Sequence, residues 1–90
     1  MKSFHMVVSG KVQGGNFQAW TQERAELLGL MGWVRNIADG QVEILVQGDV
    51  GKIAEFEQLV REKSPAPSIS GIKSEWIEYE KTYPKFEIRG

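Results

Sequence analysis

The pattern of apolar and polar residues divides the chain into strands and helices. In residues 3–9 every second side chain, from Phe4 to Val8, is the more apolar one, and this period of two predicts a strand with one better-buried face. From residue 17 to 28 the apolar positions follow helical spacing instead, which predicts a helix buried along one side. Gly29 then stands where a left-handed C-cap is expected.

The same reasoning predicts four more strands and a second helix in the rest of the chain. The predicted elements are a strand at 31–37, a tight hairpin turn at 38–40, a strand at 41–47, a helix capped by Asp49 and running to about Lys63, a strand within 69–79 and a short strand at 85–89. Within 69–79, Ile72 and Trp76 differ in parity from Ile77 and Tyr79, which predicts a β-bulge in this strand.

The order β-α-β-β-α-β, followed by a short extra C-terminal strand, is typical of an α+β ferredoxin-like sandwich. Such a fold has a mostly antiparallel sheet with two helices on one face. Ninety residues predict a single domain over 1–90. RNA-recognition modules share this element order, but they carry stacking aromatic and basic residues on central strands. The strand at 41–47 has neither, so RNA binding is disfavoured.

Composition narrows the classes of partner. Hydrophobic residues make up 41% of the chain and charged residues 26%, which is ordinary for a globular domain. Eleven Lys and Arg are scattered among twelve acids, so no basic stripe marks a nucleic-acid site. No apolar run approaches the ~20 residues of a membrane helix, the N-terminus does not resemble a signal peptide, and cysteine is absent. We therefore expect a cytoplasmic monomer without nucleic-acid or membrane partners.

The segment between the first predicted strand and helix, "GKVQGGNFQAW" at 10–20, carries the candidate chemistry. Its glycines let the backbone approach a ligand closely, and the start of a helix offers unpaired N–H groups to an anion. The cation of this stretch is Lys11, at its near end, and the helix start carries the neutral Gln18. The segment therefore predicts a phosphate site formed by backbone N–H groups, without a charged side chain at the helix start.

Two stretches give the chain a family resemblance. "VSGKVQGGNFQ" at 8–18 and "LGLMGWVRNIADGQVEILVQG" at 28–48 resemble the acylphosphatase family, whose pattern is Gly-x-Val-Gln-Gly-Val-x-Phe-Arg, then Leu-Gly-Leu-x-Gly-Trp-Val-x-Asn, then Asp-Gly-x-Val-Glu and Gly. The matches span nearly all of residues 7–48. So many residues at fixed spacings make the resemblance specific.

The resemblance implies a small enzyme that hydrolyses the carboxyl-phosphate bond of acyl phosphates without a metal or cofactor. It implies a small-molecule acyl phosphate, or inorganic phosphate or sulfate, as ligand. The family's phosphate loop corresponds to Gln13, Gly14, Gly15, Asn16 and Phe17, its water-orienting asparagine to Asn36, and its catalytic arginine to Gln18.

Two positions depart from the family pattern, since Gln18 replaces the arginine and Gly15 replaces a valine. Loss of an arginine clamp in phosphoryl transfer can reduce the rate by ~10³ or more. Three interpretations stay open: a weak acylphosphatase, a non-catalytic or altered variant that binds anions or partners, and a structural domain without a site. His5, Trp20 and Trp33 are interpreted as structural residues and not as substrate platforms.

Overall fold

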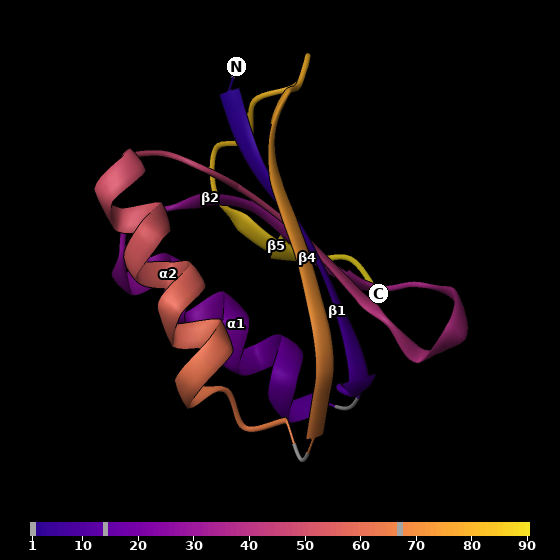
Figure 1. Ribbon diagram of the computed structural model, residues 1–90. Coiled ribbons are helices and arrows are strands. Elements are labelled where there is room, and N and C mark those ends of the chain that lie inside the picture. The colour runs from indigo at the N-terminus through magenta and orange to yellow at the C-terminus, as the bar shows by residue number, and fades with distance from the viewer. Residues whose placement is uncertain (1, 14, 67) are drawn as a thin grey trace.

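The computed structural model describes residues 2–13, 15–66 and 68–90 (Figure 1). In chain order its elements are β1 (Lys2–Lys11), α1 (Gly15–Leu27), β2 (Met31–Asn36), a 3₁₀ turn η1 (Ala38–Gly40), β3 (Val42–Gln47), α2 (Val50–Lys63), β4 (Ser68–Glu78) and β5 (Phe86–Ile88). Every predicted strand and helix is present, and the predicted boundaries lie within two residues of the observed ones.

The five strands form one sheet in the order β4-β1-β3-β2-β5. Neighbouring strands are antiparallel except β2 and β5, which pair in parallel. Both helices lie on the same side of this sheet (Figure 1). The predicted ferredoxin-like sandwich with a short extra strand is therefore confirmed.

The hydrophobic core lies between the helices and the sheet face that they cover. Because side chains alternate along a strand, residues of one parity point into this layer. The buried apolar residues are Phe4, Met6 and Val8 of β1, Val34 of β2, Val42, Ile44 and Val46 of β3, Phe17 and Ala25 of α1, Ile53, Phe56 and Val60 of α2, and Phe86 of β5. The predicted better-buried face of β1 is the one that packs against the helices.

The predicted caps are present at the C-terminal end of α1 and at the N-terminal end of α2. Gly29 has φ +71°, and the N–H of Leu30 donates to the carbonyl of Ala25 (2.9 Å), which closes the end of α1 as a Schellman-type cap. The carboxylate of Asp49 accepts from the N–H of Lys52 (3.0 Å) and caps α2. Within the described part of the chain, neither helix has the length and apolar character needed to cross a membrane.

The connection between β2 and β3 is a tight turn, as predicted. Asp39 and Gly40 have φ of 64° and 73°, and the N–H of Gln41 donates to the carbonyl of Ala38 (3.4 Å). Two central residues with positive φ define a type I′ turn, whose twist matches that of the strands it joins. This turn fixes the register that places the end of β2.

The strand β4 contains a β-bulge, as predicted. The register with β1 shifts at Gly10, opposite the extra residue Ser70. Pairing with β1 is continuous across residues 72–78, so the change of parity between Trp76 and Ile77 is not itself the bulge. These two side chains instead point to opposite faces of an edge strand, where Trp76 packs against Phe4 at a ring distance of 5.0 Å.

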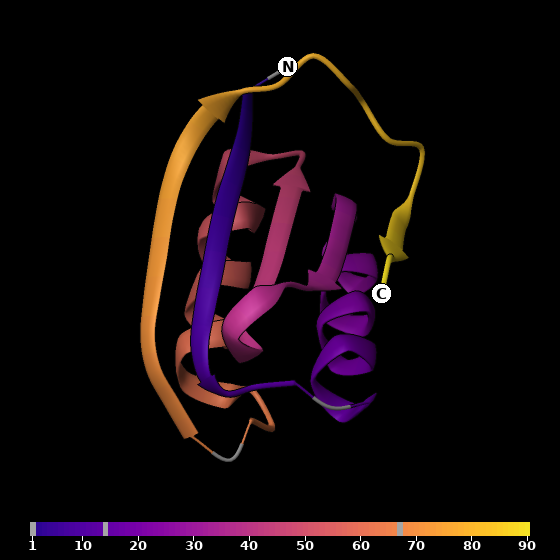
Figure 2. The same cartoon turned by 90° about the vertical axis from the view of Figure 1, so that its right-hand side faces the viewer.

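The segment 79–85 connects β4 to β5 around one end of the sheet (Figure 2). The buried side chain of Gln47 holds this segment in place. Its Nε2 donates to the carbonyl of Lys81 (2.8 Å) and to Oγ of Ser3 (3.0 Å), and its Oε1 accepts from the N–H of Tyr83 (3.3 Å). A buried amide with donors and acceptors both satisfied favours one path for the chain.

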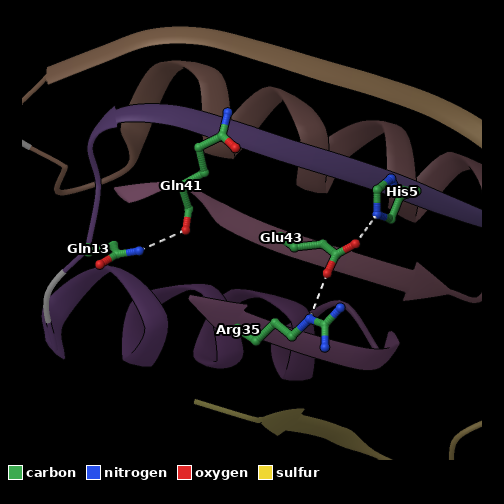
Figure 3. A network of polar contacts seen from close by, with 5 residues as sticks. All are labelled: His5, Gln13, Arg35, Gln41 and Glu43. Carbon is green, nitrogen blue, oxygen red and sulfur yellow. Dashed lines mark hydrogen bonds and ion pairs between the residues drawn. The ribbon is translucent and has the colours of Figure 1, made fainter. Parts of the chain in front are cut away.

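On the face of the sheet opposite the helices, Glu43 joins the side chains of His5 and Arg35 (Figure 3). Nε2 of His5 donates to one carboxylate oxygen and Nε of Arg35 donates to the other, each at 2.6 Å. Burial alone would raise the pKa of Glu43, but the hydrogen bonds from His5 and Arg35 outweigh it, so the pKa lies below its usual value. His5 thus has a structural role, with a partner that the sequence did not reveal.

We expect the free energy of unfolding of Glu43→Gln to fall less than that of the parent as the pH is lowered into the acid range. A carboxylate with a lowered folded-state pKa contributes stability above its unfolded pKa, and this contribution is lost as the pH falls through the folded value. The free energy of unfolding in urea at neutral pH should drop by on the order of 1 kcal/mol, and the difference from the parent should shrink toward low pH. Glu23→Gln is the control, because Glu23 forms an ion pair of the same length with Arg24 but is 64% exposed. A constant difference between parent and Glu43→Gln across the acid range would contradict the assignment.

Candidate functional site

Two buried side chains fix the ends of the glycine-rich connection between β1 and α1. Val12 precedes this connection and Phe17 follows it, and both belong to the core. Gly15 is already the first residue of α1, so the helix starts two residues earlier than predicted. Gly14 lies outside the described residues. The core thus holds both ends of a short connection.

The first turn of α1 carries no charged side chain, since residues 15–18 are Gly, Asn, Phe and Gln. The first N–H groups of a helix have no partner within it, and the helix dipole places partial positive charge there. No carboxylate of this turn neutralises that charge, unlike the start of α2, where Asp49 accepts from the backbone. The described residues of this turn thus include no acidic side chain to offset the partial positive charge of the helix start.

The structure brings together the two side chains predicted to be catalytic. Asn36 ends β2 on the helix-covered face of the sheet, and Gln18 lies in the first turns of α1. Nε2 of Gln18 donates to Oδ1 of Asn36 at 2.9 Å. Gln18 is 9% exposed and Asn36 is exposed, so the bond is partly buried and its acceptor side faces water. An amide oxygen accepts two hydrogen bonds, so Oδ1 of Asn36 can also accept one from a water molecule.

Gln13 ties the phosphate-loop segment to the β2–β3 turn. Its Nε2 donates to the carbonyls of Ile37 and Gln41, each at 3.0 Å (Figure 3 shows the bond to Gln41). Ile37 follows Asn36 directly, so this clamp sets the distance between the loop and Asn36. Because the side chain serves the turn, a contact of Gln13 with an anion would come from its backbone N–H.

The other two loop residues differ in the groups that they present. Phe17 is buried and stacks with Trp20 at a ring distance of 6.4 Å, so only its backbone N–H can serve a ligand. Asn16 is exposed and lines an open hollow together with Trp20 and Pro65. Trp20 is half-buried: one side packs on the core, as predicted, and another borders this hollow.

Arg89, near the C-terminus, does not supply the candidate site with the arginine that Gln18 replaces. Its guanidinium lies over the rings of Trp33 (5.6 Å) and Tyr83 (5.0 Å). Trp33 points to the sheet face opposite the helices, since its neighbour Val34 is in the core. The cation is therefore held across the sheet from Gln18.

Sequence reasoning missed the contacts that join these residues. Gln13 was predicted as a loop residue, but its bonds reach a turn more than twenty positions away along the chain. His5 and Glu43 share one sheet face by alternation, and this signal was available once the strands were paired. The hydrogen bond between Gln18 and Asn36 depends on side-chain rotamers, which no spacing rule specifies.

We expect Gln13→Ala to loosen the loop from the β2–β3 turn. Loss of two hydrogen bonds to carbonyls should reduce the free energy of unfolding by about 1–2 kcal/mol and speed amide hydrogen exchange at residues 15–18. The matched control is Gln41→Ala, which removes the bond from Gln41 Nε2 to Ser9 Oγ but keeps the carbonyl that Gln13 uses. Equal exchange rates at 15–18 in both variants would contradict a clamping role for Gln13.

Comparison with known proteins agrees with this architecture. The family model for acylphosphatase matches residues 4–88. A protein named acylphosphatase from Syntrophobacter fumaroxidans is 38% identical over 84 residues, covering 93% of this chain and 87% of the relative. The crystal structure of acylphosphatase from Bacillus subtilis superposes with a TM-score of 0.90 at 31% identity over the whole of both chains. The structure of an acylphosphatase from Coxiella burnetii gives 0.86 at 36% identity, covering 97% and 90% of the two chains. The chain therefore belongs to the acylphosphatase family.

Proposed function

We propose that this protein hydrolyses acyl phosphates slowly, through a neutral version of the family's site. The observation that carries the proposal is the hydrogen bond from Gln18 to Asn36 beside the start of α1. In the proposal the Asn36 amide orients the attacking water, and the nearby start of α1 binds the phosphate. The relatives named acylphosphatase support the reaction class.

The phosphoryl group binds to backbone N–H groups in the segment from Gln13 to Gln18. Such groups and the helix dipole stabilise charge on the phosphate oxygens without any side-chain cation. Positioning and charge stabilisation are the main contributions that a protein makes to phosphoryl transfer. Val12 and Phe17, which belong to the core, anchor the two ends of this segment and support the positioning.

A water molecule that donates to Oδ1 of Asn36 is the nucleophile. Its oxygen forms a bond to phosphorus while the bond from phosphorus to the acyl oxygen breaks. The acyl group leaves as a carboxylate, and both water protons end on the phosphate, so a dianionic substrate gives one carboxylate and one dihydrogen phosphate. The reaction needs no added proton donor. No metal ion or cofactor takes part in the steps proposed.

Gln18 limits this chemistry because its amide is neutral and already bonded to Asn36. An arginine offers a planar, charged fork that binds two phosphate oxygens at once.

The neutral Gln18 amide also supports a second candidate function, in which the protein binds anions or a partner without measurable hydrolysis. The two candidates differ in whether the unaltered protein hydrolyses acyl phosphates, and the assay below measures that rate.

We expect Gln18→Arg to raise the kcat of acyl-phosphate hydrolysis by ~10²-fold or more, since preorganised donors at a reacting centre contribute effects of that size. The matched control is Gln22→Arg, which adds the same charge one turn further along α1, where Gln22 bonds to the Phe86 carbonyl (3.2 Å). Adding Asn36→Ala to Gln18→Arg should abolish the gain. The measurement is steady-state hydrolysis at neutral pH. Equal rates for the parent, Gln18→Arg and Gln22→Arg would show that Gln18 does not limit the reaction.

We expect inorganic phosphate to bind weakly to the start of α1 in the unaltered protein. Without a charge-assisted pair the affinity should be lower by roughly 1.5–3 kcal/mol than that of an arginine-containing site. In an NMR titration the backbone amides of residues 14–18 should shift at millimolar phosphate. The amides at the start of α2 are an internal control, because Asp49 already caps them. Equal shifts at both helix starts, or none at 14–18, would overturn the phosphate site.

A further inference from the structure

Beside the first turns of α1 lies an open hollow of about 290 Å³. Its lining residues are Asn16, Ala19, Trp20 and Glu23 of α1, and Pro65 from the connection between α2 and β4. Asn16 belongs both to this hollow and to the predicted phosphate segment, so the two are continuous. The volume is at the lower end of the roughly 300–1,000 Å³ typical of small-molecule pockets, which suits a group no larger than one ring.

The hollow and Asn36 lie on opposite sides of the axis of α1. An α-helix turns by about 100° per residue, so the four lining residues of α1 group around one direction and Gln18 lies roughly 150° from it. Gln18 is the residue that bonds to Asn36. A phosphate held at the helix start therefore has Asn36 on one side and the hollow on the other.

This opposition matches the geometry of the reaction. In phosphoryl transfer the attacking and leaving oxygens lie roughly in line through phosphorus. If the water approaches from the side of Asn36, the leaving acyl group must extend toward the opposite side. That side is the one bordered by Trp20 and Pro65.

We propose that the hollow is the subsite for the acyl group and that it selects an uncharged, planar acyl group such as an aromatic one. The inference rests on the proposed function, whose phosphate site fixes one end of the ligand. Trp20 supplies an aromatic surface, and its ring is already supported by Phe17 (6.4 Å). Glu23, the acid of the lining, is held by Arg24 at 2.6 Å, so its charge is compensated within the protein. A charged acyl group gains nothing there, whereas a flat apolar one gains contact with the ring.

The test compares two stable analogues that differ only in the acyl part. Phenacylphosphonate and acetonylphosphonate replace the bridging oxygen of the benzoyl and acetyl phosphates by a methylene, so neither is hydrolysed. Their dissociation constants and that of inorganic phosphate are measured by NMR titration, which also follows the indole N–H of Trp20. We expect phenacylphosphonate to bind about three- to tenfold more tightly than acetonylphosphonate, the range given by an added aromatic contact.

Variants of Trp20 assign this preference to the hollow. Trp20→Leu keeps an apolar side chain on the core and should reduce the ratio of the two constants to about one, with phosphate affinity unchanged within about twofold. Trp20→Phe should restore most of the ratio. The matched control is Trp76→Leu, which alters a 39% exposed tryptophan on the edge strand β4 and should leave the ratio as in the parent.

The outcomes separate this inference from the proposed function. If phosphate binds but the two phosphonates bind equally, or if Trp20→Leu leaves their ratio unchanged, the acyl subsite is wrong and the phosphate site stands. If none of the three probes binds, both proposals are wrong. The ratio of the two dissociation constants is measured on one and the same variant. A general loss of stability weakens the binding of both phosphonates and therefore leaves this ratio unchanged.

Discussion

The two hydrogen bonds from the Gln13 side chain join the parts of the molecule from which the site is built. One part is the connection from β1 to α1, held by buried Val12 and Phe17. The other is the β2–β3 turn, whose carbonyls at Ile37 and Gln41 accept those bonds. Asn36 stands next to one of these acceptors along the chain. The side chain of Gln13 thus helps to set the distance between the helix start and Asn36, together with the pairing of β2 with β3 and the bond from Gln18 to Asn36.

The Gln18 amide carries no charge, which affects both how easily it is buried and how strongly it can bind a phosphate. An amide such as Gln18 can be 9% exposed and still be satisfied by a single partner, whereas a guanidinium in the same place needs an anion or solvent to offset its burial. The bond to Asn36 therefore suits the empty protein. The same bond uses one of the two N–H groups of the Gln18 amide, and the other is a neutral donor, so this side chain offers a phosphate less than a charged guanidinium would.

Sequence reasoning succeeded where local chemistry decides the structure. Apolar alternation gave the core face of each central strand, Gly29 marked the end of α1, and Asp39 with Gly40 specified the turn. It failed where a long-range contact decides. The parity change after Trp76 was read as a bulge, yet β4 is an edge strand with a single neighbour, so both of its faces can hold apolar residues without a break in register. The candidate site shows the same division, since its residues were predicted but the bonds between them, such as that of Gln18, were not.

The fold is compatible with the reaction axis that we propose across the start of α1. The sheet places β2, with Asn36 at its end, on one side of this helix, while the connection from α2 to β4 brings Pro65 to the other. Both neighbours are positioned by the core and by capped helix ends, not by contacts with a ligand. Nucleophile and leaving group can thus be assigned to opposite sides before any substrate is bound, which lowers the entropy cost of aligning them. In the mechanism that we propose, the fold supplies alignment, and the side chain at position 18 determines how strongly the developing charge is stabilised.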